Sequence, residues 1–451
     1  MEPGHSLGQV AVLGGGLAGL LTAHVLTRYA TGVTVVERDR YPVGPEPRAG
    51  VPQSRHTHVL LASGIQALRE LLPGFVADLT DAGAPALSVP ADVGVWQAGQ
   101  WVSRRNPSAP VMTPSRPLLD HLIRRRVLAE PRIRLMSATE ATGLLGGPDR
   151  VTGVTIRARG ARVDAELAAD LVVDATGRSS HTSAWLAELG AAEPVEEVLD
   201  AGRGYATGVC QMDGRIGDLG GFYIVPDAGQ PLGAIILPAE DNRWLVTLSG
   251  PRGQAPPTDP TGFVDFARNL PHDAPHKWLS TARLVGRPVG YRRTANRRRR
   301  YDRSAPAGLL VVGDAVCALN PVYGQGMSVA AMNAVFLDRV LAGAARRPSA
   351  HELQQAVRRS SQWAWEVATG ADSPMPGAVG NALRTGPLDR LVDRYLERVR
   401  ERVPGDPVVC RAFRDVLFLL APPRSLLTAP QVVLRSLLRA PTPTPPDLPT
   451  P

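Results

Sequence analysis

A glycine-rich turn near the N-terminus is the feature that most constrains the fold of this chain. A predicted apolar strand, Gln9–Leu13, leads into Gly14–Gly19, which reads Gly-Gly-Gly-Leu-Ala-Gly. A helical run over Leu20–Tyr29 follows, and a second apolar strand, Val33–Val36, ends at the acidic residue Glu37. This is the pattern G-x-G-x-x-G inside a strand–helix–strand unit, so it predicts a doubly wound α/β sheet.

Each residue of the turn has a physical role if the ligand is a dinucleotide. Gly14 permits the tight turn, Gly16 lets the backbone approach a pyrophosphate, and Gly19 lets the helix pack closely on the strand. Glu37 can accept a hydrogen bond from a ribose hydroxyl. The alternative, a tight turn in an unrelated fold, explains the glycines but not the acid at the end of the second strand.

A second site of the same kind lies about three hundred residues further along the chain. The predicted buried strand Leu309–Val312 ends at Gly313-Asp314, and Asn320–Met327 forms a turn rich in glycine before a helix over Ser328–Phe336. An acid and a helix N-terminus make a site for a polar, partly anionic ligand. A nicotinamide dehydrogenase does not need a second site. FAD does, because its ribityl and flavin half must also be held, and we therefore predict FAD.

Composition excludes several other classes of protein. The chain has 451 residues and a net charge of +8, but no nucleic-acid recognition motif accompanies the charge, so we expect no nucleic-acid partner. The three cysteines (Cys210, Cys317 and Cys410) are far apart and form no CxxC pair, which argues against a disulfide scaffold and suits a cytoplasmic protein.

His56 and His58 have no third ligand nearby in sequence, so we predict packing or cofactor contacts there and no metal site. No secretion signal or membrane-spanning run is expected.

The nucleotide motifs fall in separate segments, so the predicted domains are discontinuous. The FAD-binding domain is expected over residues 1–83, 111–190 and 291–345, and a β-sheet substrate domain over residues 84–110 and 191–290. Four segments within the latter (Tyr205–Asp213, Gly221–Val225, Gly233–Leu237 and Trp244–Leu248) are spaced for an antiparallel sheet. A helical region over 346–440 and a Pro-rich disordered tail over 441–451 complete the chain. We expect the C-terminal helices to cap the domain, with contact to a membrane surface as the alternative.

An arginine-rich stretch, Tyr291–Arg303, precedes the second site. One interpretation is a solvated charged edge. The other is an electropositive rim for a nucleotide phosphate or an acidic carrier.

Three motifs together resemble those of single-component flavoprotein monooxygenases, in the branch that includes squalene-epoxidase-type enzymes. The motifs are Gly14–Gly19 with Glu37, Asp174–Gly177, and Gly313-Asp314 followed by Pro321 and Gly324-x-Gly326. Further segments are similar to a bacterial group that includes the epoxidases of the monensin and lasalocid polyether pathways: Gly50–Gln53, His56-x-His58-x-Leu60, Leu72–Gly74, Tyr301, Asn320–Met327, and Trp363…Asp372…Pro374. The resemblance implies a Rossmann-like, glutathione-reductase-type FAD domain.

The resemblance also implies roles for individual residues. Gly14, Gly16 and Gly19 would face the pyrophosphate, and Glu37 the adenosine ribose. Arg38, Arg48 and Arg116 stand at positions of basic residues that contact the cofactor. Asp314 would bind the pyrophosphate–ribityl region. The isoalloxazine would face Pro321 and the backbone around Gly324, Gly326 and Met327. No catalytic side chain is nominated, because the chemistry is that of the flavin.

The implied reaction uses reduced flavin and O2 to form a C4a-hydroperoxide, whose distal oxygen epoxidises an alkene of a polyketide or terpenoid secondary metabolite, as in antibiotic biosynthesis. NADPH or NADH would be a transient reductant, visiting near the arginine-rich stretch, and a separate flavin reductase is a candidate partner. The substrate would be an apolar, polyene-like small molecule, either free or bound to a carrier protein.

Three other activities remain open. Aromatic hydroxylation of a phenol needs a base, which the sequence does not identify. Asp174-Ala175-Thr176-Gly177 also departs from the Asp-Gly of phenol hydroxylases. A flavin-dependent alkene reductase of the geranylgeranyl-reductase kind would use the same motifs without oxygen, and a flavin-binding protein without turnover would use them without chemistry. A halogenase is disfavoured, because Gly221–Pro226 lacks both tryptophans of the halogenase signature.

Overall fold

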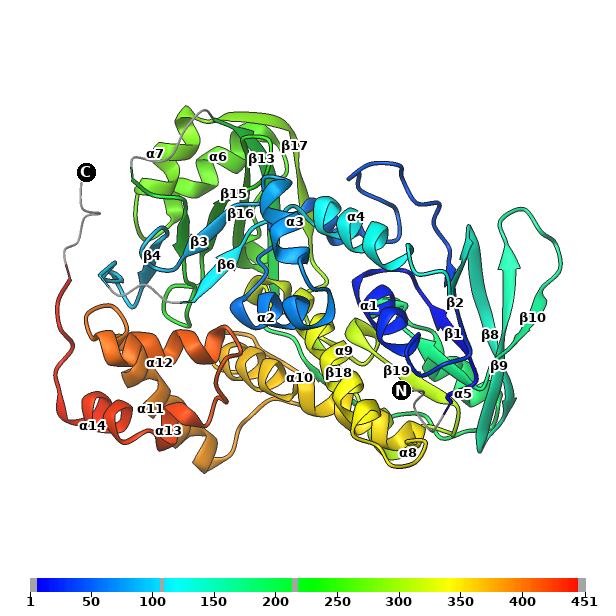
Figure 1. Ribbon diagram of the computed structural model, residues 1–451. Coiled ribbons are helices and arrows are strands. Elements are labelled where there is room, and N and C mark those ends of the chain that lie inside the picture. The colour runs from blue at the N-terminus through cyan, green and yellow to red at the C-terminus, as the bar shows by residue number, and fades with distance from the viewer. Residues whose placement is uncertain (1–5, 106–108, 213–217, 445–451) are drawn as a thin grey trace.

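The computed structural model describes residues 6–105, 109–212 and 218–444 and is built around two separate sheets (Figure 1). The first is a parallel sheet with the strand order β19-β11-β1-β2-β7. Its strands are β1 (Gln9–Leu13), β2 (Gly32–Glu37), β7 (Ile133–Ser137), β11 (Leu171–Asp174) and β19 (Leu309–Val311). The doubly wound α/β class, the second sheet and the helical C-terminal region that the sequence predicted are confirmed.

The register of the parallel sheet brings distant segments to one edge. Leu13 pairs with Asp174, which in turn pairs with Val311, and Val36 pairs with Leu13 on the other side. Because the strands are parallel, the turns that follow them all emerge at the same carboxyl-terminal edge. The glycine turn after β1 and the Gly313-Asp314 turn after β19 therefore become neighbours.

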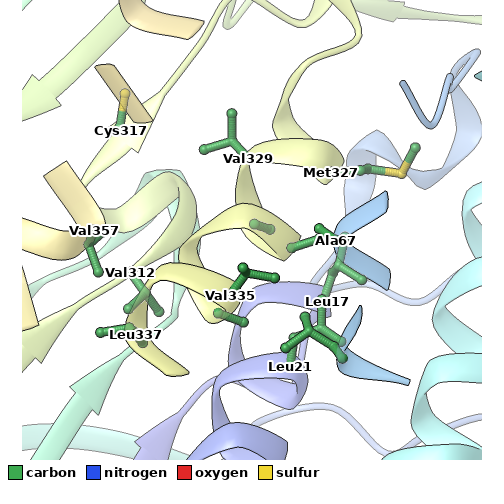
Figure 2. Close-up of a cluster of buried hydrophobic side chains, with 14 of the residues drawn as sticks. Leu17, Leu21, Ala67, Val312, Cys317, Met327, Val329, Val335, Leu337 and Val357 are labelled. Carbon is green, nitrogen blue, oxygen red and sulfur yellow. The ribbon is translucent and has the colours of Figure 1, made fainter. Parts of the chain in front are cut away.

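Small side chains let the central helices pack closely beside this sheet. α1 (Leu17–Leu26) begins earlier than predicted, because the glycine turn itself runs into the first helical turn. α9 (Gly326–Ala342) lies against α1, α2 (Ala62–Leu71) and α10 (Ala350–Asp372). Figure 2 shows the apolar side chains of these helices gathered in one cluster, with Val335 and Leu337 from α9. This packing fixes the N-terminal ends of α1 and α9 relative to the strand ends.

The second large sheet has the order β17-β13-β16-β15-β14-β4-β5 and joins early and late segments of the chain. Its strands are β4 (Gly94–Gln97), β5 (Gln100–Trp101), β13 (Arg203–Gln211), β14 (Phe222–Ile224), β15 (Gly233–Pro238), β16 (Arg243–Pro251) and β17 (Arg283–Tyr291). The four predicted strands are present; β15 and β16 are longer than predicted, and β14 is shorter. The end predicted for one of them, Asp213, lies outside the described residues. The domain boundaries stay predictions.

The two faces of this sheet serve different purposes. Side chains alternate between the faces of a strand, and Ala206, Val246 and Leu248 lie in a buried apolar cluster with Phe263 of α6 (Pro260–Phe266) and Trp278 of α7 (Ala274–Thr281). The intervening positions carry hydroxyl and aromatic side chains: Tyr205, Thr207, Thr247, Ser249 and Tyr291. One face thus builds a core, and the other is polar and faces inward.

The part of the arginine-rich stretch that forms β18 is structural, which corrects both interpretations for those arginines. β18 (Asn296–Arg299) pairs with β12 (Glu196–Leu199) and β20 (Cys317–Ala318) in a small sheet. Arg298 pairs with Glu197 at 2.5 Å and Arg299 pairs with Glu196 at 3.1 Å. Arg299 is only 7% exposed, so it is neither a solvated edge nor a rim.

The C-terminal region forms four helices that pack on the rest of the molecule: α11 (Pro387–Arg402), α12 (Pro407–Leu417), α13 (Ser425–Thr428) and α14 (Pro430–Leu438). Val399, Val409 and Val432 belong to the same buried cluster as the parallel sheet. The Ser103 N–H donates to the Pro404 carbonyl, which ties this region to the segment after β5. Among the described residues, no helix has the length and apolar character needed to cross a bilayer. Residues 445–451 of the predicted tail lie outside the described residues.

The remaining elements are short or peripheral. The sequence did not predict α3 (Phe75–Asp81), and of the three-stranded antiparallel sheet β10-β9-β8 it predicted only the middle strand. These and the other elements are β3 (Ala86–Ser88), β6 (Pro110–Met112), β8 (Thr139–Gly147), β9 (Arg150–Ala158), β10 (Ala165–Ala168), α4 (Arg116–Val127), α5 (Thr182–Glu188) and α8 (Tyr301–Ser304).

Candidate active site

One cavity connects the edge of the parallel sheet, the inward face of the large sheet and the C-terminal helices. Its volume is about 1530 Å³. Typical small-molecule pockets measure about 300–1,000 Å³, so this cavity has room for a cofactor and a substrate together. Of the twelve residues predicted to bind cofactor, eleven line it: Gly14, Gly16, Glu37, Arg38, Arg48, Arg116, Asp314, Pro321, Gly324, Gly326 and Met327.

The twelfth predicted residue, Gly19, has a packing role. A Cβ at this position would overlap the Gly14 carbonyl oxygen and approach the Ala175 Cβ to 3.2 Å. Gly19 does not line the cavity. The structure thus agrees with the role derived from the G-x-G-x-x-G pattern, close approach of helix and strand, and not with contact to the pyrophosphate.

The first glycine turn forms a cradle for an anion. Gly14 has a φ of +93°, and a Cβ there would lie 2.7 Å from the Ala175 carbonyl oxygen, so only glycine fits. Gly16 precedes α1, and no side chain caps the helix. The first N–H groups of a helix have no intrahelical partner, and they carry a partial positive charge. A pyrophosphate matches both properties.

Glu37 is held in place beside this cradle. Its Oε2 accepts a hydrogen bond from the Gly15 N–H at 2.8 Å and lies 2.9 Å from Arg48 Nη1. Its Oε1 accepts from the Asp39 N–H at 2.8 Å. A carboxylate has about four lone-pair sites, so Glu37 can still accept from a ribose hydroxyl. Arg48 also donates to the Gly15 carbonyl at 3.2 Å, and a Cβ at Gly16 would lie 3.7 Å from its Nη2.

At the other turn, Asp314 presents a carboxylate to the cavity without a hydrogen-bond or ion-pair partner among the described residues. Burial raises the pKa of this carboxyl, and the charges of Arg178 and Arg116 partly offset the effect. Gly326 lies beside it, since a Cβ there would be 3.9 Å from Asp314 Oδ1. No side chain caps α9 either. An unpaired acceptor next to an uncapped helix fits the hydroxyl groups and flavin edge of FAD.

The middle turn, which follows Asp174, lines the cavity with Ala175, Thr176 and Gly177, while its acid has a structural part. Asp174 Oδ1 accepts from the Thr176 N–H at 2.8 Å, and Oδ2 accepts from Ser180 Oγ at 2.5 Å and Thr182 Oγ1 at 2.7 Å. The carboxylate therefore holds its own turn and is not available to a ligand. Arg178, which the sequence analysis did not single out, lines the cavity while donating to the Ala295 and Leu319 carbonyls, each at 2.7 Å.

A buried aspartate holds the loop that is predicted to face the flavin. Asp372, at the end of α10, accepts from Asn296 Nδ2 at 2.6 Å, Asn320 Nδ2 at 3.0 Å and Tyr323 Oη at 2.5 Å. The residue is fully buried. Asp372 entered the sequence analysis only through the resemblance; no local pattern near it points to Asn320, which is 52 positions away.

The inward face of the large sheet supplies the polar end of the cavity. His56 lies against Tyr205 and Tyr291, with ring centroids 4.9 Å and 5.4 Å away, and its Nδ1 is 2.9 Å from Thr207 Oγ1. Burial, followed by the charge of Arg55, lowers the pKa of His56 to about 4, so the imidazole is neutral at pH 7. Tyr205 and Thr207 on β13, and Thr247 and Ser249 on β16, lie two positions apart and so share one face of the sheet. This spacing was the sequence signal for the inward face, and it was missed.

His58 and the arginines near the site have different environments. His58 Nδ1 donates to the His56 carbonyl at 2.7 Å, and burial, with the charge of Arg116, lowers the pKa of His58 to about 3.

Within the described ranges, no group of three or more His, Cys, Asp or Glu side chains could hold a metal ion. Of the arginine-rich stretch, Arg292 and Arg293 line the cavity, whereas the ion-paired arginines of β18 do not.

The C-terminal helices form the far end of the cavity, where apolar side chains stand beside charged ones such as Glu397, Arg400 and Arg414. Its lining residues there include Val392, Leu396, Phe413, Leu417 and Leu426. These helices therefore do more than cap the domain. They form a wall of the same space that the nucleotide turns enter from the opposite side.

Comparisons with known proteins agree with this geometry. A family model described as FAD binding domain matches residues 8–371. Protein Rv3254 of Mycobacterium tuberculosis is 33% identical over 430 residues, which cover 91% of this chain and 89% of that protein. The kynurenine 3-monooxygenase of Salinispora tropica is 30% identical over 373 residues, covering 78% of this chain and 76% of that protein.

A solved structure shows the same fold. The flavin-dependent brominase Bmp2 superimposes with a TM-score of 0.64 at 16% identity, covering 91% of this chain and 92% of that chain. At this identity the likeness concerns the fold alone.

Proposed function

Because this chain belongs to the FAD binding domain family, which includes monooxygenases, we propose that it is an FAD-dependent monooxygenase that hydroxylates an aromatic ring of a largely apolar small molecule. The observation that carries the proposal is the single cavity, which joins the two nucleotide turns to a sheet face rich in tyrosine and threonine side chains. A ring held on that face would lie in the same space as the cofactor.

Similarity to a named enzyme supports the reaction class. One relative is named as a kynurenine 3-monooxygenase, and its similarity extends over 78% of this chain. This favours aromatic hydroxylation over the epoxidation that the sequence motifs first suggested.

Some residues that line the cavity would bind FAD, and others would exclude water. The cradle at Gly14 and Gly16 would hold the pyrophosphate, Glu37 the ribose, and Asp314 the ribityl hydroxyl groups. The loop at Pro321 and the start of α9 would face the isoalloxazine, with Asp372 keeping that loop in place. Bound FAD supplies the activated oxygen atom. Apolar side chains of α11 to α13 would limit the access of water to the opposite end of the same cavity.

The electron donor is part of the proposal. NADPH or NADH would reduce the cofactor, and Arg292 and Arg293, which line the cavity near the sheet, are the basic side chains that would contact it. A separate flavin reductase is the alternative source of electrons, and delivery of the substrate on a carrier protein remains part of the hypothesis.

Epoxidation of an alkene is the second candidate, and the apolar side chains at the far end of the cavity favour it. Val392, Leu396, Phe413, Leu417 and Leu426 would accept a long hydrocarbon chain as readily as a ring system. The polyether epoxidases that the sequence motifs resemble act on such chains.

Product analysis with labelled oxygen separates the candidates. The purified protein, loaded with FAD and supplied with NADPH and ¹⁸O₂, is incubated with a panel of phenols, aromatic amines and polyenes. Mass gain of one labelled oxygen with loss of an aromatic proton supports hydroxylation, and loss of alkene protons supports epoxidation. NADPH oxidation without oxygen consumption, together with a saturated product, would overturn both in favour of an alkene reductase.

A further inference from the structure

A continuous row of hydrogen bonds crosses the inward face of the large sheet. His56 Nδ1 lies 2.9 Å from Thr207 Oγ1, which lies 2.6 Å from Thr247 Oγ1. Thr247 donates in turn to Thr57 Oγ1 at 2.9 Å. Thr207 and Thr247 are direct cross-strand partners on β13 and β16, so the sheet itself sets their spacing.

The direction of this row follows from the number of protons available. A threonine hydroxyl donates one hydrogen bond. Because Thr247 donates to Thr57, the contact between Thr207 and Thr247 must be donated by Thr207. Thr207 then has no proton left for His56, so the imidazole carries its hydrogen on Nδ1 and donates it. The Nε2 atom is left with an unshared lone pair.

Both ends of the row open into the cavity. His56 and Thr57 line it, whereas Thr207 lies behind them. Nε2 of His56 has no hydrogen-bond partner among the described residues, although the residue is only 3% exposed. The Thr57 hydroxyl hydrogen likewise has no acceptor there. The row therefore has an acceptor at one end and a donor at the other, facing the same space.

We propose that His56 Nε2 accepts the proton of a ring hydroxyl on the substrate, and that Thr207, Thr247 and Thr57 relay a proton onward to water in the cavity. This deepens the proposed function, on which it rests, by naming a phenol as the substrate class. His56 would be a catalytic residue, since it touches the substrate, and the threonines would act through it.

The step balances without an oxidant or reductant. The substrate O–H bond breaks, its electron pair stays on the oxygen, and a bond from Nε2 to the proton forms. The Nδ1 proton passes to Thr207, the Thr207 proton to Thr247, the Thr247 proton to Thr57, and the Thr57 proton to a water molecule. The resulting phenolate has a more electron-rich ring, which is the state that an electrophilic oxygen attacks.

The surroundings of His56 favour a neutral imidazole, which can pass a proton on but does not keep it at pH 7. Burial and then the charge of Arg55 hold its pKa at about 4, so an imidazolium does not persist at pH 7. Tyr205 on β13 and Tyr291 on β17 face the ring, and burial raises the pKa of both phenols, so they stay neutral. His58, two residues on, is neutral as well, because its own pKa is about 3.

The test uses the FAD-loaded protein and 4-nitrophenol, a phenol whose ionised form is yellow. Absorbance difference spectra are recorded against pH, with the probe free and bound. We expect bound probe to ionise at least about one pH unit lower than free probe, a tenfold shift in its acid dissociation constant. His56→Asn can still donate to Thr207 but has no atom at Nε2, and it should abolish the shift.

Thr207→Val supplies a second variant that keeps His56. It removes the acceptor of Nδ1 and interrupts the relay, so the spectral shift should shrink and oxygenation of a phenol should slow by about 100-fold or more. The matched control is His24→Asn on α1. His24 is a partly buried histidine, with Nε2 3.1 Å from the Leu71 carbonyl, and it does not line the cavity. It should leave the shift unchanged.

The outcomes separate this inference from the function it rests on. Unshifted ionisation of 4-nitrophenol in the wild-type protein overturns the relay even if both variants fail to retain FAD. A normal shift in His56→Asn also overturns it while leaving aromatic hydroxylation intact. A wild-type protein that neither binds nor oxygenates phenols, but epoxidises polyenes, overturns both.

Discussion

Tyr323 Oη donates a 2.5 Å hydrogen bond to the buried carboxylate of Asp372, which lies at the far end of α10. Through this bond and those from Asn296 and Asn320, a single side chain sets the position of the loop between β20 and α9. The loop is the predicted wall of the flavin site. Its geometry therefore depends on a residue that does not itself line the cavity.

Removing the Asp372 carboxylate should loosen that wall. Asp372→Ala leaves three buried donors without an acceptor, at a cost of about 3 kcal/mol or more in the free energy of unfolding. Tyr323→Phe removes one charge-assisted hydrogen bond and should cost about 2 kcal/mol. Chemical denaturation measures both. Visible circular dichroism of bound FAD should change in Asp372→Ala.

Tyr29→Phe is the control for these variants. Tyr29 also donates to an aspartate, Asp338, at 2.8 Å, but the pair is partly exposed and does not line the cavity. We expect a loss of less than about 1 kcal/mol, because exposed polar pairs contribute little. An unchanged flavin spectrum in Asp372→Ala would contradict the role assigned to the loop.

The unpaired Asp314 carboxylate should be needed for cofactor retention. Asp314→Ala removes an acceptor for the ribityl hydroxyls, and a hydrogen bond to a charged group is worth about 1.5–3 kcal/mol, which is about a 10- to 150-fold loss of FAD affinity. The flavin-to-protein absorbance ratio and a fluorescence titration measure it. Asp265→Ala, an exposed site on α6, serves as the control. A yellow, fully loaded Asp314→Ala protein would refute the assignment.

Stability of the protein without FAD should fall in mild acid because of the buried histidines. A pKa lowered on folding means that the unfolded chain binds protons first, so stability is present above pH 6.5 and is lost as pH falls toward about 4 for His56 and about 3 for His58. For His56 the shift from 6.5 to about 4 corresponds to about 3 kcal/mol.

Thermal melting between pH 7 and pH 4 checks this, using apoprotein. His56→Asn should lose part of the pH dependence, and His351→Asn, at an exposed position on α10, should not. Identical slopes for wild type and His56→Asn would show that the imidazole is not desolvated as described.

The ion pair between Arg298 and Glu197 should affect stability and not use of the reductant. Arg298 also lies 4.4 Å from the Trp365 ring centroid. Arg298→Ala should cost about 2 kcal/mol in unfolding free energy, since the pair is partly buried, and should leave the KM for NADPH unchanged. Arg293→Ala, in the cavity lining, should raise that KM. Steady-state kinetics that respond to Arg298→Ala alone would reverse the assignment.

The sequence carried enough information for the parallel sheet and its turns, because these depend on local rules. A glycine with a positive φ, such as Gly14, and an apolar run that ends in an acid are legible in a few consecutive residues. The same is true of Asp314, which directly follows a buried strand. Eleven of the twelve residues predicted to bind the cofactor line one cavity in the structure.

The parts that could not be predicted depend on contacts between distant segments. Asp174 looks like a ligand acid in sequence, yet its oxygens are used by Ser180 and Thr182. Arg299 looks exposed until β18 pairs with the glutamates of β12. The base proposed here, His56, could not be identified from the sequence, because it gains its partner, Thr207, only when a loop meets a strand 151 residues later.

The position of the C-terminal helices has a consequence for how such enzymes diversify. The family match ends at residue 371, whereas the apolar wall of the cavity comes from helices after that point. The proposed flavin contacts thus precede residue 372, whereas one end of the proposed substrate space is formed by a later, contiguous part of the chain. Exchanging residues 387–438 for those of a relative should therefore alter the substrate range while leaving the proposed flavin contacts unchanged.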